Sequence, residues 1–117
     1  MPFMLLIAEP RGQRETRVQS EGEALYARMV EFADQLAAEG KLIDAHALTA
    51  DTNGARVQVR EGRASIVDGP FAEAKEMIGG FFLVDCATRD EALAIARRCP
   101  AAQWASVDVR ETGPCFR

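Results

Sequence analysis

The segment VDGPFAEAKEMIGG, residues 67–80, holds the side chains of this chain that are best suited to chemistry. Asp68 directly precedes Gly69-Pro70, a turn in which an aspartate can bond nearby backbone amides. A carboxylate held rigidly in this way could act as a general base or bind a cation. We therefore predict Asp68 as the first catalytic candidate. The neighbouring residues that we predict to bind a ligand are Gly69, Pro70, Phe71, Glu73 and Lys75.

His46 is the only histidine of the chain and the second catalytic candidate. Histidine is the side chain best suited to proton transfer near neutral pH. Asp44 lies two residues away, which places both side chains on one face of a strand. One histidine among scattered carboxylates does not make a metal site, and the sequence indicates no cofactor.

The same segment also has a purely structural interpretation. Pro70 suits the first position of a short helical turn through Glu73 and Lys75, with Phe71 anchoring that turn in the core. Because glycine has no side chain, Gly79-Gly80 would let another backbone segment pack closely against this strand. The segment is thus either a site or a stiff corner of the fold, and the sequence leaves both open.

Apolar periodicity and turn residues predict the elements that position these residues. Ser20–Glu23 and Thr88–Glu91 both have the form of a capping box, which starts a helix. The first helix is predicted over Glu21–Glu39 and ends at Gly40, and the second is stopped by Pro100. The predicted strands are Phe3–Ala8, Lys41–Ala50, Arg56–Arg60, Ala64–Val67, Gly80–Cys86 and Ala105–Glu111.

This order predicts one α+β domain over residues 1–117, a ferredoxin-like sandwich with an inserted β-hairpin. The strands Phe3–Ala8 and Gly80–Cys86 are apolar on both faces, yet two helices cover only one face of such a sheet. We expect a second copy to cover the other face and form a homodimer. The alternative cover is the hairpin of the same chain.

Composition narrows the classes of partner. The net charge is −4 and the basic residues are scattered among acidic ones, so we expect no nucleic-acid binding. The first apolar run lacks the basic leader and cleavage site of a signal peptide, and no run approaches the roughly 20 residues of a membrane span. Cys86, Cys99 and Cys115 are odd in number and far apart, as in a reduced cytoplasmic protein.

The string Asp68–Glu76, followed by Gly79-Gly80-Phe81-Phe82, resembles the signature of the DGPF branch of the YCII-related proteins, with Ala74 where that branch commonly has threonine. The resemblance extends over nearly the whole chain and implies a ferredoxin-like fold that forms dimeric α/β barrels. In some wider-family members a His–Asp pair is catalytic, with the histidine at the start of the first helix. This chain has Glu21, Gly22 and Glu23 there, which argues against that chemistry.

Two functions follow from the sequence and the resemblance. The first is a dimeric protein that binds an unidentified small molecule in a cleft beside the DGPF turn, with lyase- or isomerase-type acid–base chemistry by Asp68 and His46. The second is a non-enzymatic accessory or regulatory protein. The resemblance links that second function to extracytoplasmic-function sigma factors, because some relatives are encoded beside them.

Overall fold

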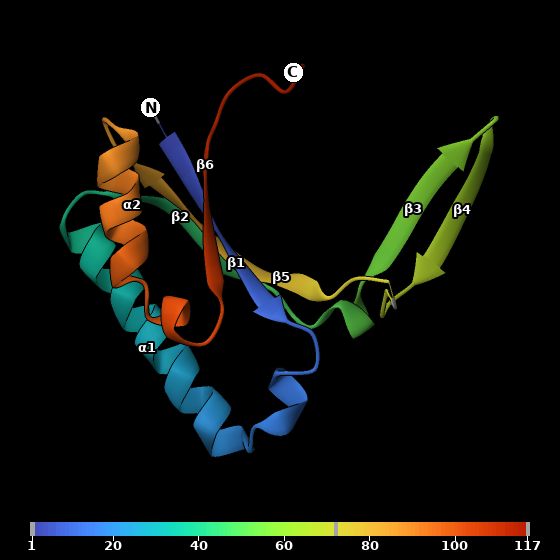
Figure 1. Cartoon of the computed structure of the whole chain (residues 1–117), viewed down its shortest axis with the longest axis horizontal. Helices are drawn as coiled ribbons and strands as arrows, with labels where there is room; N and C mark the ends of the chain where they lie inside the picture. The colour runs from blue at the N-terminus through green and yellow to red at the C-terminus, as the bar shows by residue number, and fades with distance from the viewer. Residues whose placement is uncertain (1, 72, 117) are drawn as a thin grey trace.

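The computed structural model describes residues 2–71 and 73–116, which form a four-stranded antiparallel sheet, a separate hairpin and two α-helices (Figure 1). The sheet has the order β2-β5-β1-β6. Its strands are β1 (Pro2–Pro10), β2 (Leu42–Ala47), β5 (Glu76–Asp85) and β6 (Ser106–Glu111), and the helices are α1 (Gln19–Ala38) and α2 (Arg89–Arg98). Three short 3₁₀ turns are η1 (Arg14–Thr16), η2 (Asp51–Asn53) and η3 (Pro100–Gln103). The predicted α+β class is confirmed, and the strand order is consistent with a ferredoxin-like fold.

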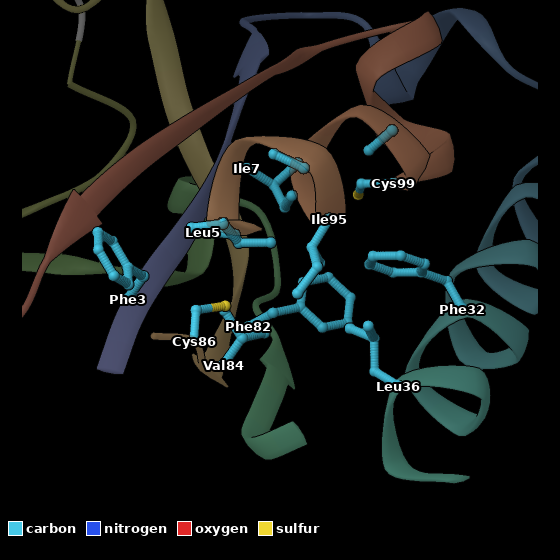
Figure 2. Packing of buried hydrophobic residues seen from close by; sticks show 13 residues of the cluster. Phe3, Leu5, Ile7, Phe32, Leu36, Phe82, Val84, Cys86, Ile95 and Cys99 are labelled. Carbon is cyan, nitrogen blue, oxygen red and sulfur yellow. The ribbon is translucent and has the colours of Figure 1, made fainter. Parts of the chain in front are cut away.

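The core lies between the two helices and one face of the sheet (Figure 2). Alternate residues of the central strands point into it, as strand geometry requires. The ring of Phe32 on α1 meets Phe82 on β5 edge to face, with centroids 5.2 Å apart. The buried cluster is Phe3, Leu5, Ile7, Phe32, Leu36, Phe82, Val84, Cys86, Ala92, Ile95, Ala96, Cys99 and Ala101. Neither helix of the described residues is long and apolar enough to cross a lipid bilayer.

The start of α1 differs from the prediction. The helix begins at Gln19, Val18 occupies the N-cap position, and no side chain caps the first turn. The Val18 carbonyl already accepts hydrogen bonds from the amides of Glu21 and Gly22, both at 3.1 Å. Ser20 is therefore inside the helix, and the predicted Ser20–Glu23 capping box does not form.

Two other helix boundaries are confirmed. Thr88 caps α2 by accepting a hydrogen bond from the Glu91 amide at 3.2 Å. After α1, Gly40 has a φ of +72°, and its amide donates to Ala37 while the Lys41 amide donates to Leu36. This pair of bonds is the Schellman arrangement, which favours glycine at that position.

The hairpin of β3 (Ala55–Arg60) and β4 (Arg63–Asp68) projects away from the sheet (Figure 1). Its turn, Glu61-Gly62, has positive φ at both residues, 53° and 76°, which suits a two-residue hairpin. The Cα radius of gyration of 16.0 Å exceeds the ~13 Å of a compact domain near this size. The hairpin therefore does not cover the sheet, and that predicted alternative is wrong.

The sheet face opposite the helices is apolar at its centre. Met4 pairs with Leu83 and Leu6 with Phe81 across β1 and β5, and all four side chains are half-buried in the single chain. We call these four residues the open face. Strands that are apolar on both faces normally have both faces covered, and the homodimer that would cover this one stays a prediction.

The remaining boundaries shift for local reasons. The second strand was predicted over Lys41–Ala50 but ends at Ala47, since the next residues turn into η2. The strand predicted from Gly80 begins at Glu76, and a bulge at Gly79 re-registers it: Ile7 pairs with Gly80 but Ala8 with Ile78. The Ala74 amide bonds the Phe71 carbonyl at 3.0 Å and closes a single turn there, while residue 72, within the predicted helical turn, lies outside the described residues.

Candidate functional site

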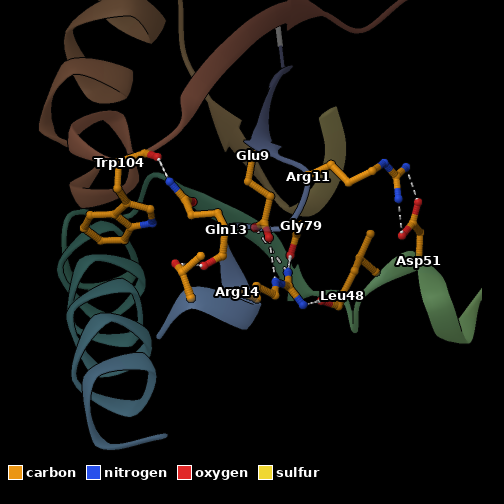
Figure 3. Close-up of polar contacts among 9 residues, drawn as sticks. Glu9, Arg11, Gln13, Arg14, Leu48, Asp51, Gly79 and Trp104 are labelled. Carbon is orange, nitrogen blue, oxygen red and sulfur yellow. Dashed lines mark hydrogen bonds and ion pairs between the residues drawn. The ribbon is translucent and has the colours of Figure 1, made fainter. Parts of the chain in front are cut away.

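The DGPF turn is fastened to the body of the protein by Arg11. Its guanidinium forms a two-bond ion pair with Asp51 of η2, with Nη1 2.9 Å from Oδ1 (Figure 3). Its Nε donates to the Ala74 carbonyl at 2.7 Å and its amide to the Lys75 carbonyl at 3.0 Å. The Arg11 hydrogen bond holds the pKa of Asp51 below its usual value. One side chain thus joins the end of β1, η2 and the motif.

The packing around Gly69 explains why the motif has a glycine at this position. A Cβ built on it would lie 1.8 Å from the Asp51 carbonyl oxygen, far inside van der Waals contact. The Gly69 amide also donates to the Gly54 carbonyl at 2.8 Å. Only a residue without a side chain fits against η2 here, so this part of the motif has a structural role.

The other predicted motif residues lie at the surface. Asp68, Pro70, Glu73 and Lys75 are exposed, and Glu73 forms an ion pair with Arg56, which lowers the pKa of Glu73. Phe71 is half-buried beneath the Arg56 guanidinium, whose Cζ lies 4.2 Å from the centroid of the Phe71 ring. Phe71 is not part of the core cluster. The prediction that Phe71 anchors the core is therefore wrong.

His46 lies on β2, whereas Asp68 is the last residue of β4. Its Nε2 is 3.2 Å from Asp44 Oδ1, so the predicted proximity of His46 and Asp44 is present. The ring is 5.7 Å from the Phe81 ring, which places it on the open face. Asp68 and His46 form neither a hydrogen bond nor an ion pair with each other. Their predicted catalytic partnership stays a prediction.

A cleft of about 630 Å³ lies between α1 and the sheet, at the end where β1 and β2 finish and β5 begins. Its walls are mostly apolar and include Met29, Val30 and Ala33 of α1, Ala45 and Ala47 of β2, and Phe82 of β5. Tyr26 and Trp104 add aromatic surface. None of the predicted motif residues from Asp68 to Lys75 that the structure describes lines it, although Gly79 and Gly80 do.

A partly buried ion pair closes the sheet end of this cleft. Glu9 is only 7% exposed and binds Arg14 through Oε1–Nε at 2.6 Å and Oε2–Nη2 at 3.2 Å (Figure 3). Arg14 also donates to the Leu48 carbonyl at 2.9 Å. A Cβ at Gly79 would lie 2.2 Å from Glu9 Oε2, so the glycine makes room for the pair.

Sequence reasoning missed this polar group. Glu9 continues the core-facing alternation Phe3, Leu5, Ile7, so a strand extended by one residue would have predicted a buried carboxylate in need of a cation. The cleft also contains Arg17, which lies between the first predicted strand and the first predicted helix. Nothing in the sequence indicated that a cleft would separate α1 from the sheet at this end.

Over residues 1–113 the chain matches the YCII-related domain, and it belongs to the YCII-related family. Uncharacterized protein R00369 of Rhizobium meliloti (strain 1021) is 38% identical over 85 residues. That alignment covers 73% of this chain and 63% of the relative, less than two-thirds of its length.

A solved structure has the same fold at low sequence identity. It is 5-chloro-2-hydroxyhydroquinone dehydrochlorinase (TftG) from Burkholderia phenoliruptrix AC1100, in complex with 2,5-dihydroxybenzoquinone. The TM-score is 0.58 at 16% identity, with 97% of this chain and 94% of that chain covered. At this identity the likeness concerns the fold.

Proposed function

We propose that this YCII-related protein binds a small molecule with a largely apolar, ring-containing body in the cleft between α1 and the sheet. The observation that carries the proposal is the cleft itself, about 630 Å³ with apolar and aromatic walls and a polar end. Small-molecule sites have this size and this mixture of surfaces. The 2,5-dihydroxybenzoquinone in complex with TftG is a single-ring compound of the same general kind.

The proposal moves the binding site from the DGPF turn to the cleft. The turn supports the site indirectly, because Gly79 and Gly80 line the cleft and Arg11 fixes the segment that precedes them. The string Asp68–Glu76 also supports placing the chain in the DGPF branch of the family.

Gly22 gives a direct test of the cleft. It lines the cleft on α1, and a Cβ built there has no neighbour within 4 Å. Gly22→Phe should therefore fill part of the cleft without disturbing the fold. We expect 2-naphthamide to shift cleft amide signals in NMR spectra of the wild type and to bind Gly22→Phe at least about tenfold more weakly, a loss of roughly 1.4 kcal/mol.

Ser20→Phe is the matched control, since Ser20 is exposed on the same helix and does not line the cleft. This variant should bind like the wild type. Equal binding by all three proteins, or shifts confined to residues outside the cleft, would refute the cleft as the site.

Acid–base chemistry of lyase or isomerase type by Asp68 and His46 is a separate proposal, because Asp68 does not line the cleft and the His46 ring lies on the open face. Asp68 is exposed and bonds no described residue through its side chain, so Asp68→Asn should change stability by less than about 0.5 kcal/mol. If Asp68 reaches a bound ligand, the variant loses affinity at unchanged stability. Unchanged affinity for every ligand of the cleft would remove Asp68 from the site.

The homodimer is the second half of the proposal. The open face leaves four central apolar side chains half-exposed, and the hairpin of the same chain projects away from it. The hairpin itself exposes Val57, Val59 and Ile66, each more than half. A second copy packed against the open face would cover apolar surface that the single chain leaves to solvent.

A further inference from the structure

We infer that the ligand of the cleft is a monoanion, such as an aromatic carboxylate, and that Arg17 is the side chain that binds its negative charge. The inference rests on the proposed function, because it specifies the ligand of the same cleft. It follows from the charges that line the cleft and from which of their hydrogen-bond donors the protein already uses.

The basic and acidic side chains of the cleft sum to one positive charge. Its charged lining residues are Glu9, Arg14 and Arg17, and it also contains His46, which is paired with Asp44. Glu9 and Arg14 cancel as a two-bond ion pair. The charge of Arg17 is left over, in a chain whose net charge is −4. A ligand with one negative charge would balance it.

Arg14 has few donors left for a ligand. Its Nε and Nη2 bind Glu9, Nη1 donates to the Leu48 carbonyl, and Nη2 also approaches the Gly79 carbonyl at 3.5 Å. Its role is to hold Glu9 and to tie together the ends of β1, β2 and β5. A guanidinium has five N–H donors, and at least three of those of Arg14 bind protein atoms.

Arg17 is in the opposite situation. Its side chain is half-buried at the cleft and makes no hydrogen bond or ion pair with any residue among 2–71 and 73–116. Glu15, Glu21 and Glu23 are nearby in sequence but are exposed and do not line the cleft. None of the five donors of the Arg17 side chain bonds a residue that the structure describes, and a guanidinium matches a carboxylate with two parallel bonds.

The ring of His46 does not compete for this role. It lies beside Phe81 on the open face and is paired with Asp44. Arg28, the arginine of α1, is placed over Trp104 and bonds Gln103, and it does not line the cleft. Arg17 is therefore the cation that a charged ligand would meet.

The test compares 2-naphthoate with 2-naphthamide, which has the same shape without the charge, by isothermal titration calorimetry at pH 7. We expect the carboxylate to bind the wild type about tenfold more tightly than the amide. Arg17→Gln should remove that preference and leave amide binding unchanged, and Arg17→Lys should restore part of it. Raising the salt concentration should weaken carboxylate binding alone.

Arg63→Gln is the matched control, since it removes the same charge from an exposed hairpin position outside the cleft. It should keep the preference for the carboxylate. Equal affinities of the two probes for the wild type, or a preference that survives in Arg17→Gln, overturn the role of Arg17 and leave the cleft proposal standing. Absence of binding by both probes overturns the cleft and the inference together.

Discussion

Gly69 has no room for a side chain, because its Cα faces the backbone of η2 rather than a movable side chain. A Cβ would lie 1.8 Å from the Asp51 carbonyl oxygen and 2.8 Å from its carbon. Gly69→Ala must therefore displace backbone, and we expect it to lower the free energy of unfolding by roughly 1–3 kcal/mol or more. Urea denaturation at pH 7 measures the loss.

Gly22→Ala is the control for this prediction. Gly22 lies within α1, and its added Cβ meets nothing within 4 Å, so the substitution should raise stability by about 0.5–1 kcal/mol. If the free energy of unfolding falls for Gly69→Ala and rises for Gly22→Ala, the loss at Gly69 comes from its close packing against η2. It then does not come from the general effect of glycine on the unfolded chain. A Gly69→Ala protein as stable as the wild type would contradict the observed packing against η2.

The Arg11–Asp51 pair predicts a pH dependence. Its hydrogen bond lowers the pKa of Asp51 below the usual 3.8. A carboxyl with a lower pKa in the folded than in the unfolded state contributes stability above its unfolded pKa, and loses that contribution as pH falls through its folded pKa. The wild type should therefore exceed Asp51→Asn in stability most at pH 7, and the difference should shrink below about pH 4.

The measurement is urea denaturation of both proteins at several pH values between 7 and 3. Glu39, Glu73 and Glu91 also have lowered pKa values, each because of a basic partner, so both proteins will lose stability in acid. The comparison between the proteins isolates Asp51. A difference that stays constant across this range would show that the carboxylate charge at Asp51 does not stabilise the fold.

At the scale of elements, the two sequence patterns that resemble capping boxes make opposite predictions. Thr88 accepts the Glu91 amide at the start of α2, so Thr88→Ala should cost about 1 kcal/mol. Ser20 lies one residue inside α1 and caps nothing, so Ser20→Ala should change stability by less than about 0.5 kcal/mol. Similar losses for both variants, measured by urea denaturation, would place the start of α1 back at Ser20.

This contrast shows where sequence reasoning succeeded and where it failed. Local patterns predicted the order of the elements, the Gly40 helix end and the hairpin turn, since each depends on bonds between near neighbours. The start of α1 was missed because the preceding segment is bound by distant partners: Gln13 Nε2 donates to the Trp104 carbonyl at 2.6 Å. A contact across 91 positions leaves no local pattern.

The candidate site was predicted less well for the same reason. The motif is conspicuous in sequence because glycine, proline and charges cluster in it. Its contacts, however, are with distant residues: Gly69 packs against η2, and the Ala74 carbonyl accepts a hydrogen bond from Arg11. The cleft depends on how α1 packs against the sheet. Its polar residues come from three neighbouring segments: Glu9 from β1, Arg14 from η1 and Arg17 from the link between η1 and α1. Only their juxtaposition indicates a site.

At the scale of the whole molecule, the open face connects the fold to its assembly. The sequence predicted strands apolar on both sides, and the structure places Met4, Leu6, Phe81 and Leu83 half-exposed on the face without helices. Stable dimers bury about 800 Å² on each partner. The chain mass of 12.8 kDa makes the two states easy to distinguish by light scattering after gel filtration.

We expect the wild type to elute at twice the chain mass and Leu83→Arg at the mass of one chain. An arginine at the centre of the open face would place two uncompensated charges in the dimer interface, at a cost of several kcal/mol. Leu83 is not part of the core cluster, so the variant should keep its helical circular dichroism. Ala37→Arg, at an exposed position on α1, should remain dimeric. A monomeric wild type, or a dimeric Leu83→Arg, would mean that something other than the open face of a second copy covers these strands.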